Sequence, residues 1–484
     1  MPLQNGKIYS NFENSKDTAK MTKPTPKIPQ EEIAAQLAYC GQIAAMARLG
    51  AAYVDTYGCQ QNEADSEKLR GYLEKMGCRI TRDENKADIV VVNTCAIREH
   101  AEMRALGNVG ALTHTKRHNK NQIVVICGCM VQQEHMAEKI KNSYRHVDLV
   151  FGPQALWRFP ELLHRTLTGN MRVFDRDETE GAIAEGIPVL RDNGVKAWLP
   201  VMYGCNNFCS YCVVPFVRGR ERSREPSDVL ENAKKLVAEG ARDITLLGQN
   251  VNSYSGGGTS FPELIRKIND IPGDFRLRFM TSHPKDAGEE LFRAMAESEK
   301  CARHLHLPVQ SGSDSVLREM NRGYTCAHYM KLALQAREFM PDLVLTSDII
   351  VGFPGESEQD FENTINLIET VRFDALFTFI YSRREGTRAA LIPDDTPREE
   401  ISRRFDRLLA VQNSISAEKH AAYVGKTMRV LVDSAGSGAS HNLSARTDGG
   451  RLVHLSGSEA LVGSYAYAKI TGASTWALFG EISE

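Results

Sequence analysis

Apolar and polar residues alternate along residues 49–168 in a pattern that predicts buried strands separated by helices. Short apolar runs at residues 52–57, 89–94 and 123–127 are continuous enough to be strands buried on both faces. Between the first two runs, Leu69, Leu73 and Met76 recur at helical spacing. Strands that alternate with helices form a parallel sheet with right-handed crossovers. We therefore expect an open α/β domain over residues 49–168, in which the last predicted strand is at residues 145–152.

The alternation resumes after residue 195 and predicts a second, larger α/β domain over residues 195–422. Six strands are too few for the closed eight-stranded barrel, so an incomplete (β/α)6 barrel with one open side is expected. The open side can admit a large substrate. The predicted strands cover residues 197–203, 243–247, 275–281, 304–307, 344–351 and 375–380.

The two ends of the chain and the segment at 169–194 follow different patterns. Residues 423–484 show short alternating strands broken by glycines, at 427–433, 451–455 and 464–471, which predict a small all-β barrel. Residues 169–194 are polar and contain glycine, as expected of a linker. Residues 1–48 begin with a stretch rich in Lys, Pro, Asn and Ser, which predicts a disordered extension.

Composition narrows the class of protein. A chain of 484 residues predicts two or three domains, and a net charge of −2 means that any RNA site must be a local patch. Eleven cysteines without a secretory segment favour a reducing compartment. No apolar run approaches the roughly 20 residues that cross a bilayer. We expect a cytoplasmic monomer without membrane contact.

Three cysteines, Cys205, Cys209 and Cys212, have C-x3-C-x2-C spacing. Three thiolates can hold a four-iron cluster and leave one iron open to bind a small molecule. The spacing resembles that of the radical S-adenosylmethionine (SAM) enzymes, in which the open iron binds SAM. The alternative is a zinc knot or three unrelated core cysteines, but no fourth Cys or His follows within the loop.

A second set, Cys59, Cys95 and Cys129, stands just past the three apolar runs of the first domain. In a parallel sheet the carboxyl ends of all strands lie on one edge, so these thiols can meet there. They predict a second three-cysteine cluster, with chance core thiols or a disulfide as the alternative. Cys127 is a rival ligand, but it falls within the strand and is interpreted as core.

These two triads resemble those of the methylthiotransferase family of radical SAM enzymes, and the resemblance extends from about residue 51 to 484. The sequence segments at residues 93–102 and 213–224 are most similar to the corresponding segments of family members that act on N6-isopentenyladenosine in tRNA. Two sister groups act on threonylcarbamoyladenosine in tRNA and on a ribosomal-protein aspartate. The family usually has two prolines in the loop at 381–387, where this chain has Arg383 and Glu385.

The resemblance implies two 4Fe-4S clusters, one for radical SAM chemistry and one auxiliary, and methylthiolation of adenosine C2 beside the tRNA anticodon. One SAM would methylate a sulfur of the auxiliary cluster, and a second would yield the radical that removes hydrogen from C2. Acid/base catalysis could not activate that C–H bond, and the protein's part is to position the base and exclude water. An electron donor such as a flavodoxin or ferredoxin is implied. Polar segments follow the barrel strands, and within them the resemblance implies that Gln249, Gln310 and Ser311 contact SAM. Each of the three is equally consistent with a turn residue.

The resemblance also places a TRAM domain, which grips tRNA, at residues 423–484. Tyr465, Tyr467 and Trp476 are candidates for base stacking, or else core residues. Clusters of basic residues lie at three places: residues 114–120, the run Arg218, Arg220, Arg222 and Arg224, and the loop that contains Arg383, Arg384 and Arg388. They are either phosphate contacts for the anticodon stem-loop or solvated surface. Two other functions remain open: a sister methylthiotransferase specificity, and a non-catalytic iron-sulfur RNA-binding protein.

Overall fold

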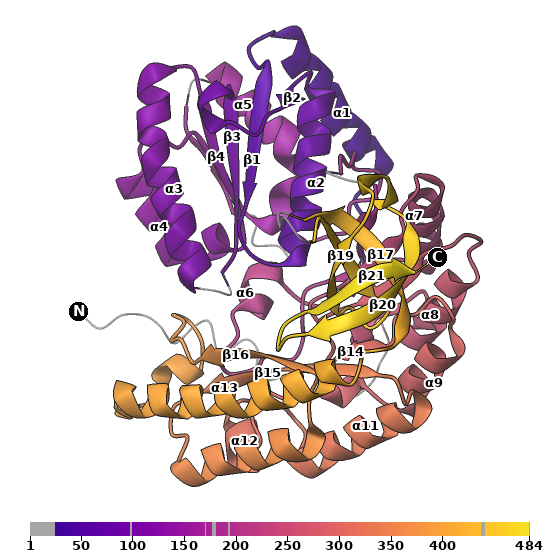
Figure 1. Ribbon diagram of the computed structural model, residues 1–484. Coiled ribbons are helices and arrows are strands. Elements are labelled where there is room, and N and C mark those ends of the chain that lie inside the picture. The colour runs from indigo at the N-terminus through magenta and orange to yellow at the C-terminus, as the bar shows by residue number, and fades with distance from the viewer. Residues whose placement is uncertain are drawn as a thin grey trace.

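The computed structural model describes residues 25–96, 99–169, 171–176, 181–191, 194–436 and 441–483. The first half of the predicted extension, residues 1–24, lies outside the described residues. So do Ile97 and Arg98, which belong to the segment at residues 93–102 that carries the family resemblance. Figure 1 shows an α/β domain above a half-open layer of strands and helices, with a small β-barrel beside both.

The first domain is a six-stranded parallel sheet between two layers of helices. The strand order is β2-β1-β3-β4-β5-β6. Helices α1, α2 and α5 pack on one face, and α3 and α4 cover the other (Figure 1). The strands are β1 (Ala51–Thr56), β2 (Arg79–Ile80), β3 (Ile89–Thr94), β4 (Ile123–Gly128), β5 (Leu149–Phe151) and β6 (Val173–Asp175); the helices are α1 (Gln30–Ala45), α2 (Gln60–Lys75), α3 (Glu99–His118), α4 (Glu134–Ser143) and α5 (Phe159–Gly169).

Two segments expected to lie outside domains belong to this one. Helix α1 falls within the predicted extension, so that prediction is wrong for residues 30–45: Ile33, Cys40 and Ile43 recur at helical spacing and are buried. Strand β6 falls within the predicted linker and pairs with β5 in parallel. Its three-residue length explains why the pattern was too short to detect.

The central domain contains the six predicted strands in two parallel sheets, β7-β10-β13 and β14-β15-β16. Apolar side chains of these strands pack outward against the helices. The strands are β7 (Lys196–Pro200), β10 (Asp243–Leu247), β13 (Arg276–Phe279), β14 (His304–His306), β15 (Val344–Val351) and β16 (Ala375–Ile380); the helices are α6 (Val214–Arg218), α7 (Pro226–Ala238), α8 (Phe261–Asn269), α9 (Glu289–Glu297), α10 (Asp314–Glu319), α11 (Cys326–Phe339), α12 (Glu358–Val371) and α13 (Arg398–Ala421). Four two-residue strands complete the domain, β8 (Met202–Tyr203), β9 (Arg222–Ser223), β11 (Ser255–Gly256) and β12 (Thr259–Ser260).

Helix α13 leads into a closed five-stranded barrel with the order β17-β18-β19-β21-β20. The sequence pattern located three of its strands and missed β18 and β21. The expected fold class, two α/β domains and a small all-β barrel, is confirmed. Among the described residues, no helix has the length and apolar character to cross a membrane. The strands are β17 (Thr427–Ala435), β18 (Leu443–Thr447), β19 (Leu452–Ser456), β20 (Tyr465–Ala473) and β21 (Leu478–Ser483).

The small barrel docks on the amino-terminal ends of the central strands. Arg276, the first residue of β13, donates to the carbonyl oxygen of Thr447 at 2.7 Å and pairs with Asp243 at 2.7 Å. Arg429 pairs with Asp274 at 2.6 Å just before β13. The carboxyl ends of the same strands, where a parallel barrel places its active site, stay clear of this contact.

Candidate cluster sites and active site

The structure brings Cys59, Cys95 and Cys129 together at one edge of the first sheet. They follow β1, β3 and β4, which are neighbours in the strand order. The pKa of the Cys129 thiol is raised to about 12. Burial is the largest cause, the charge of Arg218 acts in the opposite direction, and the nearby Cys95 and Cys59 add to the increase. Three thiolates this close repel one another, and bound metal cations would stabilise them as a set.

Glycines make this convergence possible. Gly58 has a φ of +128°, and a Cβ atom there would lie 2.4 Å from Cβ and 2.9 Å from Sγ of Cys95. Gly128 has a φ of +97°, and its Cβ would lie 2.4 Å from the carbonyl oxygen of Thr94. Only glycine accepts both the backbone conformation and the close approach. Each of these glycines directly precedes a cysteine of the triad.

Cys127 lies apart from the triad. Its side chain belongs to the apolar core on the face of the sheet covered by α1, α2 and α5. Cys129 instead packs with Ala96, Val213 and Val217 at the boundary between domains. Cys127 still belongs to β4, whereas Cys129 follows Gly128, whose φ of +97° turns the backbone out of the strand, so the two side chains diverge.

Cys205, Cys209 and Cys212 lie in the loop between β8 and β9, which pair as short antiparallel strands. Burial raises the pKa of the Cys205 thiol to about 12, with Cys209 contributing, and Cys209 and Cys205 both raise the pKa of Cys212. Phe208 adopts a positive φ of 46° directly before Cys209, and the Cys212 amide donates to the Cys209 carbonyl at 3.0 Å. The loop thereby turns all three thiols toward one another.

Both triads suit a multi-iron cluster. Among the described residues, no three His, Cys, Asp or Glu side chains converge as the ligands of a single metal ion would. The thiolates of a four-iron cluster bind separate irons, so they need to surround a volume instead. Each triad also has one buried arginine bonded to sulfur: Arg218 Nε lies 3.1 Å from Cys129 Sγ, and Arg322 Nη1 lies 3.3 Å from Cys209 Sγ. These arginines would offset the negative charge of a thiolate-bound cluster at each site.

Buried polar atoms without a protein partner gather in loops at the carboxyl ends of the barrel strands. Within the described ranges, Asn250 Oδ1, Ser282 Oγ, His283 Nε2 and Tyr381 OH have no hydrogen-bond partner. They follow β10, β13 and β16. A buried polar atom left unpaired costs roughly 1–3 kcal/mol, so these atoms fit a site that a polar ligand completes. The amino-acid end, ribose and adenine of SAM supply such groups.

His283 has a defined protonation state. Its Nδ1 accepts a hydrogen bond from the backbone N–H of Lys285 at 3.2 Å, which leaves the proton of the neutral ring on Nε2. Burial, followed by the charges of Arg322 and Lys285, lowers the pKa of His283 to about 2. The ring is therefore a neutral hydrogen-bond donor at working pH. The sequence marked this strand end as polar but did not single out His283.

The three predicted SAM contacts are placed differently. Gln249 Oε1 accepts a hydrogen bond from the Gly204 amide and so holds the start of the cysteine loop. Gln310 is buried, with a φ of 73°, and its backbone bridges Asp348 and Ile350 of β15. Ser311 is fully buried with its hydroxyl 3.4 Å from that of Thr364. Their role toward SAM stays a prediction.

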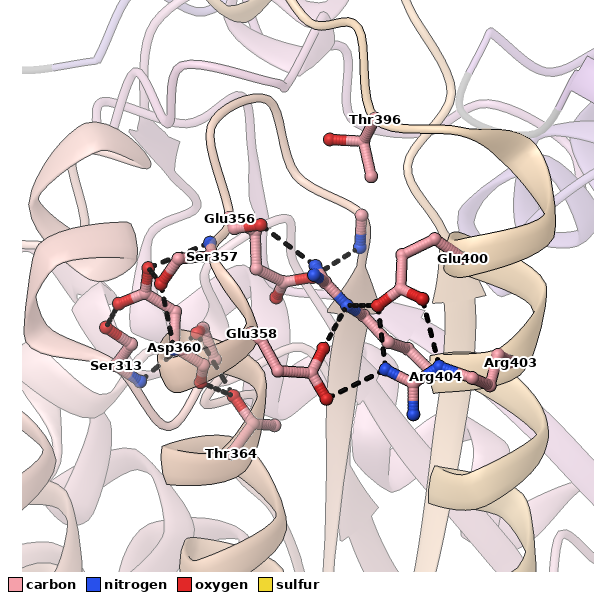
Figure 2. Close-up of polar contacts among 12 residues, drawn as sticks. Ser313, Glu356, Ser357, Glu358, Asp360, Thr364, Thr396, Glu400, Arg403 and Arg404 are labelled. Carbon is pink, nitrogen blue, oxygen red and sulfur yellow. Dashed lines mark hydrogen bonds and ion pairs between the residues drawn. The ribbon is translucent and has the colours of Figure 1, made fainter.

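A network of charges supports the loop after β15. Glu356 is 4% exposed and accepts from the Gly352 amide at 2.8 Å, while Arg404 of α13 donates to the Glu356 carbonyl at 2.9 Å. Figure 2 shows that Arg404 also forms ion pairs with Glu358 and Glu400. Because one guanidinium is shared by three carboxylates, burial dominates and raises the pKa of Glu356 to about 7.

Two of the four arginines in the predicted basic run are not on the surface. Arg218 pairs with Asp65 at 2.8 Å and Arg224 pairs with Glu185 at 2.6 Å, and all four side chains are largely buried. The prediction of an RNA contact is wrong for Arg218 and Arg224, because burial in ion pairs removes them from any phosphate. These two arginines instead form part of an internal scaffold around the cysteine loop.

The small barrel presents an aromatic and basic face. Tyr467 and Trp476 are 59% and 63% exposed, which rules out the core interpretation for both. Lys469 and Lys426 are exposed beside Tyr467 on β20 and at the start of β17. Tyr465 instead contacts the central domain, donating from its hydroxyl to the Arg242 carbonyl at 2.8 Å.

Three family descriptions match the chain in the order of its domains. "Uncharacterized protein family UPF0004" matches residues 51–152, "Radical SAM superfamily" matches residues 199–368, and "TRAM domain" matches residues 421–483. The first two ranges cover most of the first sheet, without β6, and most of the partial barrel, without β16, and the third covers the small closed barrel.

Curated relatives match almost the whole chain. The tRNA-2-methylthio-N(6)-dimethylallyladenosine synthase of Thermoanaerobacter sp. (strain X514) is 47% identical over 435 residues, which cover 89% of this chain and 92% of that protein. The protein of the same name from Acetivibrio thermocellus is 48% identical over 432 residues, 89% and 90% of the two chains. Among solved structures, the radical SAM methyltransferase TsrM from Kitasatospora setae aligns with a TM-score of 0.52 at 17% identity, over 70% of this chain and 77% of that one. That likeness concerns the fold.

Proposed function

The chain belongs to the tRNA-2-methylthio-N(6)-dimethylallyladenosine synthase family of radical SAM methylthiotransferases, and we propose that it methylthiolates C2 of N6-isopentenyladenosine beside the tRNA anticodon. One observation carries the proposal: 47% identity, sustained over 435 residues, to a relative of that name. Both cysteine triads lie within the aligned family domains. SAM and two 4Fe-4S clusters are the cofactors of this chemistry.

We assign the auxiliary cluster to Cys59, Cys95 and Cys129 and the radical SAM cluster to Cys205, Cys209 and Cys212. Three thiols from neighbouring strand ends support the first assignment, and three from one loop support the second. When bound, the two clusters with SAM supply a carbon radical able to remove the C2 hydrogen and a methylated sulfur to replace it.

The chain's own residues bind and orient the reactants. Asn250, Ser282 and His283 offer unpaired polar atoms, within the described part of the chain, where the barrel strands end. The neutral His283 ring can donate but not accept through Nε2, so it suits an oxygen or an unprotonated ring nitrogen. The barrel helices and the contact between the first domain and the segment after Cys212 limit the access of water to the carboxyl ends of the barrel strands.

The last barrel strand supplies an apolar wall suited to the dimethylallyl group. Phe377 and Phe379 are 49% and 38% exposed, although they lie on the inner face: Phe377 pairs in register with Asp348, and its ring packs on His306 at 5.6 Å. Large apolar side chains left exposed inside a half-open barrel favour an apolar ligand. A threonylcarbamoyl group carries a carboxylate and gains nothing from such a wall.

We also propose binding partners and a cellular location for the protein. Tyr467, Trp476, Lys426 and Lys469 form the candidate contact for the tRNA, since stacking and phosphate pairing are sequence-tolerant ways to hold a stem-loop. Reductive chemistry requires an electron donor, for which we propose a flavodoxin or ferredoxin. We further propose a cytoplasmic monomer.

The direct test is an assay of reconstituted protein with SAM, a reductant and isopentenylated tRNA, followed by mass spectrometry of the nucleosides. Methylthiolated isopentenyladenosine is expected. The variant with Cys59, Cys95 and Cys129 changed to Ala should still form 5′-deoxyadenosine but no methylthiolated nucleoside. Product on threonylcarbamoyladenosine tRNA or on a ribosomal protein, with none on isopentenylated tRNA, would establish a sister specificity. Absence of SAM cleavage by the unaltered protein would leave a non-catalytic RNA-binding protein.

A further inference from the structure

Helix α6 connects the two cysteine triads. It begins at Val214, two residues after Cys212, and ends at Arg218 against the first domain. Val213 and Val217 pack with Ala96 and Cys129 in one small apolar cluster. Ala96 follows Cys95, and Val213 follows Cys212. Immediate neighbours of both triads are therefore in direct contact, and this five-residue helix sets the separation of the two sites.

Arg218 extends from the end of α6 into the first domain, where its side chain makes three polar contacts. Nη1 is 2.8 Å from Asp65 Oδ2, Nη2 donates to Asn62 Oδ1 at 3.1 Å, and Nε donates to Cys129 Sγ at 3.1 Å. Arg218 is 5% exposed and Asn62 is fully buried. The guanidinium thus spans the domain boundary with each edge engaged.

Asn62 links the same arginine to a second cysteine. Its amide nitrogen donates to the Thr94 carbonyl at 2.9 Å, which turns Oδ1 toward Arg218 and toward Cys59 Sγ, 3.4 Å away. Arg218 therefore contacts Cys129 directly, and it shares Asn62 Oδ1 with Cys59, which donates to that oxygen while its thiol is protonated. An arginine needed only for docking would be satisfied by Asp65, and the contacts with sulfur and Asn62 go beyond that need.

We propose that Arg218 is the positioning residue that couples the two sites, fixing the Cys129 sulfur and tuning the auxiliary cluster. The inference rests on the proposed function, because it takes Cys59, Cys95 and Cys129 as cluster ligands. A hydrogen bond and a positive charge at a ligating sulfur stabilise the reduced, more negative cluster and raise its reduction potential. Domain docking through α6 thereby controls both the position and the potential of the auxiliary site.

The test isolates the auxiliary cluster in the full-length chain with Cys205, Cys209 and Cys212 changed to Ala. Electron paramagnetic resonance during a redox titration gives the midpoint potential and the spectrum. Arg218→Gln should shift the potential to more negative values and change the spectrum, and Arg218→Lys, which keeps the charge, should shift it less. Arg224→Gln is the matched control, since it removes a buried ion pair from the same run away from sulfur.

A second measurement uses the chain with all six cysteines. In Arg218→Gln, 5′-deoxyadenosine formation should persist, while methylthiolated product per radical formed falls at least tenfold. Potentials and product ratios equal to wild type would overturn the inference. If Arg218→Gln loses the auxiliary iron, Arg218→Lys decides: a retained cluster with a shifted potential supports the inference, and iron loss shared with Arg224→Gln indicates general misfolding and overturns it. Absence of an auxiliary signal before Arg218 is altered would instead reject the proposed cluster site.

Discussion

Arg384 Nη1 donates to Glu102 Oε2 at 2.7 Å and so ties the loop after β16 to helix α3 of the first domain. Both side chains are largely buried, and Gln133 donates to the other carboxylate oxygen at 3.0 Å. The loop lacks the two prolines usual in the family, and this ion pair anchors it instead. Arg384 is therefore unavailable to RNA, which corrects the expectation for one of the three loop arginines.

Arg383 and Arg388 remain exposed in the same loop, and we expect them to contact tRNA phosphates. Changing both to Ala should weaken tRNA binding and make the plot of log affinity against log salt less steep by about 2, since each lost phosphate contact contributes roughly 0.9. Binding across a salt series measures this. A slope equal to wild type would mean that the two arginines are only solvated.

The iron content tests the ligand sets. Two clusters predict about eight irons in the reconstituted protein, and changing Cys205, Cys209 and Cys212 to Ala should leave about four. Cys127→Ala is the control and should keep all eight, because its thiol lies in the apolar core. A loss of the auxiliary iron in Cys127→Ala but not in Cys129→Ala would reverse the assignment of these two cysteines.

Gly58→Ala should remove the auxiliary cluster while leaving its ligands in the sequence. The new Cβ would lie 2.4 Å from the Cβ of Cys95, and the backbone φ of +128° disfavours alanine independently. We expect iron to fall from about eight to about four per chain. Gly41→Ala, in helix α1 with nothing within 4 Å of the added methyl group, should keep its iron. Full iron in Gly58→Ala would show that the strand ends can shift apart.

Much of this site could be predicted from the sequence because its ligands follow buried strands. Parallel topology alone places Cys59, Cys95 and Cys129 on one sheet edge. The contacts across domains could not be predicted. Nothing in the local pattern distinguishes the buried Arg218 from Arg220, which is only partly buried. The difference arises from Asp65, a residue 153 positions earlier, which meets Arg218 only after the domains dock.

Short or irregular elements were the other failure. Strand β6 has three residues, too few for a period of two to be recognised, and α1 precedes the region of family resemblance. The polar segments at the barrel strand ends could be identified from the sequence. Which of their side chains find a hydrogen-bond partner depends on tertiary contacts and could not. Ser311 turned inward to Thr364, whereas His283 kept an unpaired nitrogen in the described structure.

Glu356 predicts a specific pH dependence of stability. Its pKa rises from 4.5 to about 7 in the folded state, so the native protein binds more protons than the unfolded chain between these values. The free energy of unfolding should therefore fall as pH rises through this window, by about 3 kcal/mol. Glu356→Gln should remove that part of the dependence, as measured by denaturant unfolding from below pH 4.5 to pH 8.

The control for this prediction is Glu362→Gln, which removes a partly exposed carboxylate that pairs with Arg407 and not with Arg404. It should leave the pH dependence in place. An unchanged profile in Glu356→Gln would mean that Arg404, 3.6 Å from the Glu356 carboxylate, keeps it ionised throughout.

The wall formed by Phe377 and Phe379 predicts where preference for the prenylated base arises. Replacing either residue with Ala removes apolar surface that only the dimethylallyl group can use, at a cost of about 1–3 kcal/mol. The ratio of kcat/KM for isopentenylated over unmodified tRNA should then fall roughly 10- to 100-fold. Ile380 lies on the opposite face of the same strand and is 44% exposed, so Ile380→Ala should keep the ratio. An equal loss on both tRNAs in the Phe variants would instead assign them to the packing of β16, because a packing defect does not discriminate between substrates.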